Sequence, residues 1–163
     1  MRERPERSYE AESGQLRSVD RRRSRTFEGP LHAAKRRSVH DFVRRFVPLL
    51  KSAGEGTVVM VSSGLGSLGW LSDPANQFYG VSILGYNSSK SALNAVALAF
   101  AKELASVGIK VDAVDPGYTA TDFNNHSGHL TVEQAAAGIV WLATQDPAGP
   151  SGRFYFEQNQ IPW

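Results

Sequence analysis

Two short apolar segments, separated by a long stretch rich in Ala and Leu, constrain the fold of this chain more than any other feature. Residues 57–62 form a near-continuous run of β-branched residues, which is typical of a strand covered on both faces of a parallel sheet, and residues 109–114 are predicted to form the next strand. Residues 85–107 lie between them and favour a helix that ends near Gly108. Strands that alternate with helices indicate right-handed βαβ crossovers and therefore predict a parallel sheet.

Further segments on both sides extend this alternation. Apolar residues recur at three- and four-residue spacing over residues 39–50, which indicates a helix whose last turn is disturbed by Pro48. Thr131 is suited to cap a helix that runs to about residue 144, with a glutamine at the box position. Residues 153–157 are predicted to form a last strand. The order predicts an α/β fold, a Rossmann-like parallel sheet with flanking helices.

The N-terminal part of the chain differs from the rest in charge. Residues 1–51 contain fourteen Lys and Arg against seven Asp and Glu, whereas the remaining residues contain four against nine. Three interpretations stay open: a disordered basic leader, an arm that binds nucleic acid, and a segment that is not native coding sequence. Nucleic acid is disfavoured because no zinc motif or aromatic stacking pattern accompanies the arginines. We expect residues 1–38 to be a leader and residues 39–163 to be the domain.

Composition argues against several classes of protein. The chain has no cysteine, so it forms neither a disulfide framework nor a thiolate metal site. No apolar run reaches the ~18 residues of a membrane-spanning helix, and no apolar segment follows the N-terminal arginines as it would in a secretory signal. We therefore expect a cytoplasmic protein without a membrane partner, and the sequence assigns no oligomeric state.

Tyr86 and Lys90 are the first candidate pair for chemistry. Residues four apart share one face of a helix, so the pattern predicts a phenol beside an ammonium group. A free tyrosine has a pKa near ~10, and a neighbouring cation lowers that pKa by stabilising the phenolate. Such a pair is suited to proton transfer at a carbonyl or an alcohol, although the spacing alone occurs in many proteins.

The surroundings of this pair resemble a known family. A serine closes the strand in residues 59–63, the Tyr86/Lys90 pair opens the following helix, and Pro116-Gly117 closes the next strand in residues 111–121. This order resembles the short-chain dehydrogenase/reductase family over roughly residues 39–163. The long loop between the serine and the tyrosine is similar to the carbonyl-reductase-like branch.

The resemblance implies a hydride transfer between a nicotinamide cofactor, NAD or NADP, and a small carbonyl or alcohol substrate. Tyr86 would be the general acid or base, Lys90 would lower its pKa, and Ser63 would donate a hydrogen bond to the substrate oxygen. Ser62 is the alternative serine, although its place in the strand suggests that it points away. The cofactor-binding residues implied by the resemblance are Tyr86, Lys90, Pro116, Gly117, Thr119 and Thr121.

One part of the family pattern is missing from the sequence. The Thr-Gly-x-x-x-Gly-x-Gly turn that would hold the pyrophosphate does not occur. Residues 64–69 match G-x-G-x-x-G superficially, but they follow the serine strand and are interpreted as a substrate-side loop. We therefore expect the C-terminal half of the fold, truncated of its N-terminal strands, with the serine strand as an open apolar edge. The alternative function is an inactive remnant or an interaction module.

Overall fold

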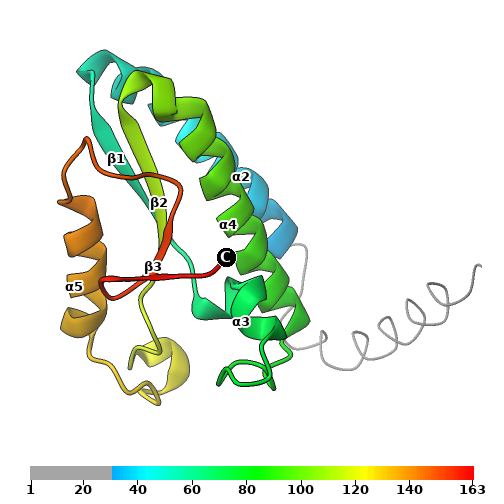
Figure 1. The fold of residues 1–163 in the computed structure, drawn as a ribbon. Coiled ribbons are helices and arrows are strands. Elements are labelled where there is room, and N and C mark those ends of the chain that lie inside the picture. Colours follow the sequence, from blue (N-terminus) through cyan, green and yellow to red (C-terminus); the bar gives the residue numbers. More distant parts are fainter. Residues whose placement is uncertain (1–30) are drawn as a thin grey trace, which may run out of the picture.

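A four-stranded sheet forms the centre of the structure, a computed structural model that describes the backbone of residues 31–163 and the side chains from residue 39 on. The strands lie in the order β1-β2-β3-β4. They comprise β1 (Gly56–Val61), β2 (Ile109–Asp115), β3 (Phe154–Phe156) and β4 (Asn159–Ile161). β1, β2 and β3 are parallel, and β4 is antiparallel to β3 (Figure 1). The predicted Rossmann-like α/β fold is confirmed.

The antiparallel β4 was not predicted, because its polar segment lacks the apolar run of the other strands. It follows β3 through a two-residue turn, and Phe156 pairs with Asn159 across that turn. Glu157 at the turn has a φ of 53°, a left-handed conformation that favours glycine over a residue with a Cβ. The hairpin therefore depends on a backbone conformation that local propensity argues against.

The two central strands differ in how deeply they are buried. All seven residues of β2 are buried, whereas Met60 is the only buried residue of β1. β1 forms the edge of the described sheet, as predicted, and most of its residues are only partly buried. The Ser62 N–H donates to the Val114 carbonyl at 2.7 Å. Because backbone groups alternate in direction along a strand, those of residues 57, 59 and 61 point to the open edge.

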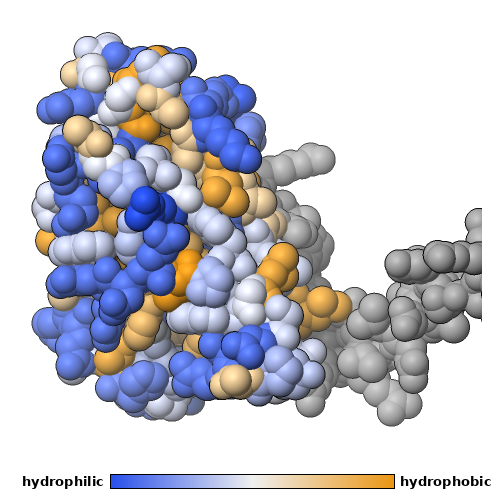
Figure 2. Space-filling view, in the orientation of Figure 1, coloured by the Kyte–Doolittle hydropathy of each residue, from blue (hydrophilic) through white to orange (hydrophobic). Residues whose placement is uncertain are grey.

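Helices cover both faces of this sheet. α2 (Leu31–Ala53) and α4 (Leu84–Leu104) lie together on one face and α5 (Val132–Ala143) lies on the other (Figure 1). The main core lies between the sheet and the first two helices and includes Val43, Val47, Ala97, Phe100, Leu104, Ile109, Val111 and Phe154. On the face shown in Figure 2, hydrophilic residues predominate, and the hydrophobic ones form small separate groups.

α2 begins at Leu31, eight residues before its predicted start. The intervening Ala, Lys and Arg residues are strong helix formers, although their charge suggested a leader. The predicted leader up to residue 30 lies outside the described residues. Pro48 is accommodated inside the helix, which continues to Ala53. No helix in the described part of the chain is long and apolar enough to cross a membrane.

Two predicted helix ends are confirmed. Thr131 caps α5 by accepting a hydrogen bond from the backbone N–H of Gln134, and the Gln134 side chain accepts one from the Thr131 N–H. After α4, a short 3₁₀ turn leads to Gly108, whose φ of 70° is left-handed. Gly108 therefore ends the long helical segment directly before β2.

Candidate functional site

The turn after β1 separates the roles of the two candidate serines. Ser62 is buried, and its hydroxyl donates to the Asn94 side chain at 2.5 Å. Ser63 begins the short 3₁₀ helix η1 (Gly64–Gly66), where its Oγ accepts from the Leu65 N–H at 3.2 Å. Ser62 is thus used in holding the strand to α4, whereas Ser63 is only partly buried. This arrangement supports the choice of Ser63 over Ser62.

The Ser63 turn is docked on α4 through Gly66. The Gly66 carbonyl accepts hydrogen bonds from Ser91 Oγ at 3.0 Å and from Asn94 Nδ2 at 3.2 Å. A Cβ at Gly66 would lie 2.8 Å from the backbone and Cβ of Lys90, so glycine allows the turn to approach the helix closely. Asn94 was not singled out from the sequence, although it lies one turn beyond Lys90 on the same helix face.

The Tyr86/Lys90 pair lies on α4 at the end of β1. Lys90 Nζ donates to the Val61 carbonyl at 3.2 Å and lies 5.8 Å from the centroid of the Tyr86 ring. A cation at this distance is within the range in which an aromatic ring attracts it. Tyr86 is 37% exposed, so its phenol is accessible. Lys90 thereby connects the tyrosine to the strand that leads into Ser63.

The predicted cofactor-binding segment follows β2 at the same edge of the sheet. Parallel strands place their carboxyl ends together, and Val61 is paired with Val114, just before Pro116. Gly117 has a φ of 75°, which favours glycine. Thr119 Oγ1 donates to the Gly117 carbonyl at 3.3 Å. Thr121 precedes the short 3₁₀ helix η3 (Asp122–Asn124), and its N–H donates to Asn124 Oδ1 at 3.0 Å.

Asp115, which sequence reasoning missed, lies between these two segments. It is 6% exposed, and its Oδ1 accepts from the Gly117 N–H at 2.9 Å. Burial raises the pKa of the Asp115 carboxyl, while the N–H groups of Gly117 and Gly64 and the charge of Lys90 act in the opposite direction. The available signal was a carboxylate at the C-terminal end of a predicted strand, directly before Pro-Gly.

The glycines of residues 64–69 serve packing in this structure. A Cβ at Gly64 would lie 2.7 Å from both Asp115 and Phe78, and one at Gly69 would lie 2.8 Å from Pro162. The spaces beside these glycines are thus filled by the chain itself, which argues against a phosphate cradle there. Tyr79, the other phenol of this region, is 55% exposed.

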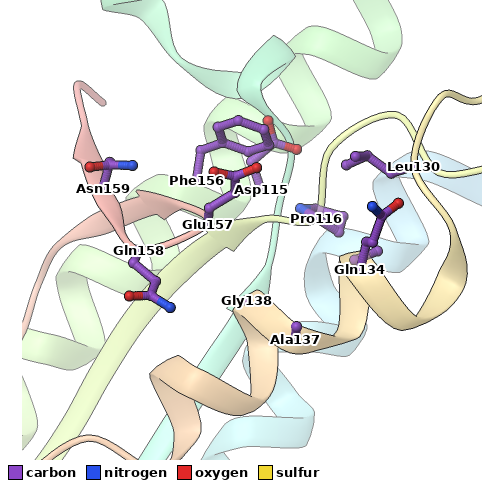
Figure 3. A pocket seen from close by; sticks show the side chains of 11 residues that line it. Asp115, Pro116, Leu130, Gln134, Ala137, Gly138, Phe156, Glu157, Gln158 and Asn159 are labelled. Carbon is purple, nitrogen blue, oxygen red and sulfur yellow. The ribbon is translucent and has the colours of Figure 1, made fainter.

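A hollow of about 530 Å³ lies on the α5 side of the Asp115–Pro116 segment. Figure 3 shows three walls: the end of β2, the first turns of α5 with Gln134, and the β3–β4 turn from Phe156 to Asn159. Apolar groups and amide side chains alternate around it. Asp115 therefore contributes to this hollow and to the Ser63 turn.

A parallel α/β sheet with polar side chains at the carboxyl ends of its strands defines a Rossmann-like protein. A profile described as short chain dehydrogenase matches residues 34–130. This match covers more than half of the 163 residues, and the chain belongs to the short-chain dehydrogenase family.

Curated relatives share this family. The chain is 32% identical over 122 residues to the short-chain dehydrogenase anuI of Penicillium roqueforti, a match that covers 71% of this chain and 48% of that protein. It is 41% identical over 78 residues to short-chain dehydrogenase/reductase 1 of Saponaria officinalis, covering 48% of this chain and 25% of the relative. The chain thus spans about half or less of the length of these relatives.

Solved structures of carbonyl reductases and related enzymes share the fold. The NADPH-bound carbonyl reductase from chicken fatty liver superposes with a TM-score of 0.60 at 25% identity, covering 74% of this chain and 50% of that one. Salutaridine reductase from Papaver somniferum gives a TM-score of 0.60 at 25% identity, covering 72% and 50%. The predicted carbonyl-reductase-like resemblance is confirmed at the level of family and fold.

Proposed function

We propose that the protein takes part in NAD- or NADP-dependent interconversion of a small carbonyl compound and its alcohol. The observation that carries this proposal is the position of Lys90, whose Nζ is bound to Val61 and lies 5.8 Å from the Tyr86 ring. A cation beside the ring of the proposed proton donor is the arrangement that proton exchange at Tyr86 requires in this proposal. The strand held by Lys90 ends at Val61, two residues before Ser63, so the three groups belong to one corner of the fold.

Each of these residues has a distinct part in the proposed reaction. Tyr86 gives its phenolic proton to the substrate oxygen during reduction and takes it back during oxidation. Ser63 Oγ uses a lone pair to accept from the Leu65 N–H, which leaves its hydroxyl proton for the substrate oxygen as negative charge develops there. Lys90 keeps a positive charge beside the phenol throughout.

The side chains at this edge fit the nicotinamide end of the cofactor. When bound, the nicotinamide supplies or accepts the hydride, which is chemistry that protein side chains do not provide. Lys90 and Tyr86 would hold its ribose hydroxyls, and Pro116, Gly117, Thr119 and Thr121 would line the ring. The NADPH-bound chicken carbonyl reductase supports this class of cofactor. Within residues 31–163 the glycines next to Ser63 are packed against the chain itself and offer no place for the pyrophosphate.

Turnover of NADPH and NADH with a panel of aliphatic and aromatic aldehydes and ketones tests the proposal. Tyr86→Phe removes the acidic proton and retains the ring, so we expect kcat/KM to fall by about 10²–10⁴-fold. Tyr79→Phe is the matched control, because Tyr79 is also exposed but has no lysine four residues later. Equal rates for Tyr86→Phe and the unmodified chain would contradict the assignment, as would the absence of any cofactor binding or turnover.

A further inference from the structure

The carboxylate of Asp115 contacts two loops at once. Its Oδ1 accepts from the Gly117 N–H at 2.9 Å, in the segment proposed to line the nicotinamide. The Gly64 N–H is near enough to lower the pKa of the same carboxyl, and a Cβ built on Gly64 would lie 2.7 Å from Asp115 Oδ2. Gly64 directly follows Ser63. One side chain therefore joins the loop after β1 to the loop after β2.

The Ser63 turn is held from two opposite sides. On one side, Ser91 and Asn94 of α4 donate to the Gly66 carbonyl. On the other side, Gly64 is packed so closely on Asp115 that a Cβ there would lie 2.7 Å from Asp115 Oδ2. The carboxylate of Asp115 thus lies directly beside the Gly64 backbone and restrains the N-terminal end of the turn. The direction of the Ser63 side chain follows from the direction of this turn.

The charge of Asp115 also reaches the other proposed catalytic groups. Lys90 on α4 lies close enough to lower the pKa of the Asp115 carboxyl, so the carboxylate in turn attracts the Lys90 ammonium. From the β3–β4 turn, Glu157 lines the same hollow (Figure 3). These are the charged groups next to Asp115 on the elements packed around it. Loss of its charge would thus weaken both loop contacts and the attraction to Lys90 together.

We propose that Asp115 is a positioning residue, which holds the Ser63 turn and the Pro116-Gly117 segment in a fixed relation and orients Lys90 electrostatically. This inference rests on the proposed function of Ser63, Tyr86 and Lys90. Asp115 does not touch the reacting atoms in this assignment. It acts through the backbone N–H groups of its two neighbours, and its effect on the reaction depends on its ionised form.

Because Asp115 is buried, its proposed positioning role depends on pH. Burial raises the pKa of Asp115 above that of an ordinary aspartate, so the carboxyl takes up a proton as the pH falls through the range just above the ordinary value. A neutral carboxyl accepts hydrogen bonds less strongly and no longer attracts Lys90. Acidification therefore loosens both loops at a pH at which exposed aspartates are still ionised.

The first test measures the two amides directly, in the full chain labelled with nitrogen-15. Asp115→Ala should speed hydrogen exchange at both Gly64 and Gly117 by about tenfold, the loss expected for one hydrogen bond each. Asp115→Asn is isosteric and guards against misfolding, and it should also abolish the pH-dependent shift that both amides share in the unmodified chain. Asp112→Asn is the matched control on the same strand and should leave both amides unchanged. Separate titration midpoints for the two amides, or unchanged exchange in Asp115→Ala, would overturn the proposal.

The second test measures turnover. Asp115→Asn should lower kcat several-fold and remove the acidic limb of the kcat profile, while the KM for NADPH stays within about twofold. A chain that shows the amide effects but no turnover would refute the proposed function and leave the structural role of Asp115 standing. A chain that turns over substrate with a kcat profile unaffected by Asp115→Asn would refute the positioning role alone.

Discussion

Asp112 is a charged residue in the middle of the core, and we expect that Asp112→Asn stabilises the protein at neutral pH. The side chain is fully buried in β2. Its Oδ1 accepts from the Arg153 N–H at 2.8 Å, whereas its Oδ2 has no hydrogen-bond partner. The nearby Gly152 N–H donates instead to the Val111 carbonyl at 3.0 Å. One carboxylate oxygen is therefore buried without compensation.

The sign and size of the effect follow from this environment. Burial raises the pKa of Asp112 above 3.8, although the Arg153 N–H and the charges of Lys110 and Arg153 lower it in part. In the pH range between 3.8 and the raised value the folded state binds more protons than the unfolded state, so the free energy of unfolding falls as the pH rises. At pH values above that range, each unit by which the pKa is raised lowers the free energy of unfolding by about 1.4 kcal/mol. An unsatisfied buried acceptor lowers it by about 1–3 kcal/mol. These two estimates describe the same penalty, so we expect a gain of roughly 1–2 kcal/mol.

Urea unfolding followed by tryptophan fluorescence measures this gain at neutral and at acidic pH. The asparagine retains an oxygen for the Arg153 N–H, and its gain should vanish below the ordinary aspartate pKa, where Asp112 is itself neutral. Asp73→Asn is the matched control, because Asp73 also accepts one backbone N–H, from Ala75 at 2.9 Å, but is exposed. This reasoning would be refuted if Asp112→Asn gave no increase in the free energy of unfolding at neutral pH, or only the increase seen for Asp73→Asn. It would also be refuted if the increase persisted unchanged in acid.

Three further substitutions probe local features of the fold. Thr131→Ala removes the cap of α5 and should lower the free energy of unfolding by about 1 kcal/mol, as thermal unfolding would show. Gly66→Ala places a Cβ against the α4 backbone and should destabilise by about 1–3 kcal/mol, whereas Gly80→Ala meets nothing within 4 Å and should be nearly neutral in the same assay. Thr57→Pro blocks the open edge of β1 without removing a bond to β2, so light scattering should show less aggregation than for the unmodified chain. The Val58 N–H points to β2, so Val58→Pro should instead unfold the strand. Equal effects of the two substitutions would contradict the assigned alternation of backbone groups along β1.

The sequence was sufficient to predict an element where the residues that determine it lie within one short segment. The capping box of α5 lies within four residues, and β2 was predicted as a strand that ends at the following Pro116-Gly117. The start of α2 at Leu31 was obscured by charge, because helix propensity and net charge indicate different things about an Arg- and Lys-rich segment. β4 could not be predicted, since its pairing depends on β3 and on a turn that local preference disfavours.

The candidate site shows the same division. The spacing of Tyr86 and Lys90 on one helix, the order of Ser63 before them and the Pro116-Gly117 turn after them were readable in the chain. The sequence favoured Ser63 because of the place of Ser62 in the strand, and the contact of Ser62 with Asn94, 32 residues away in sequence, supports that choice. Asp115 was missed because its partners belong to two different loops.

The sequence by itself determined which elements form and which side chains are available for chemistry, since periodicity, capping and turn residues act within a few positions of one another. Only the tertiary structure decided that Ser62 is held by Asn94, that the spaces beside the glycines after Ser63 are filled by the chain's own atoms, and that a buried carboxylate connects the two loops. The physical reason is that burial and pKa shifts depend on groups brought together from distant segments, and no local pattern encodes those neighbours.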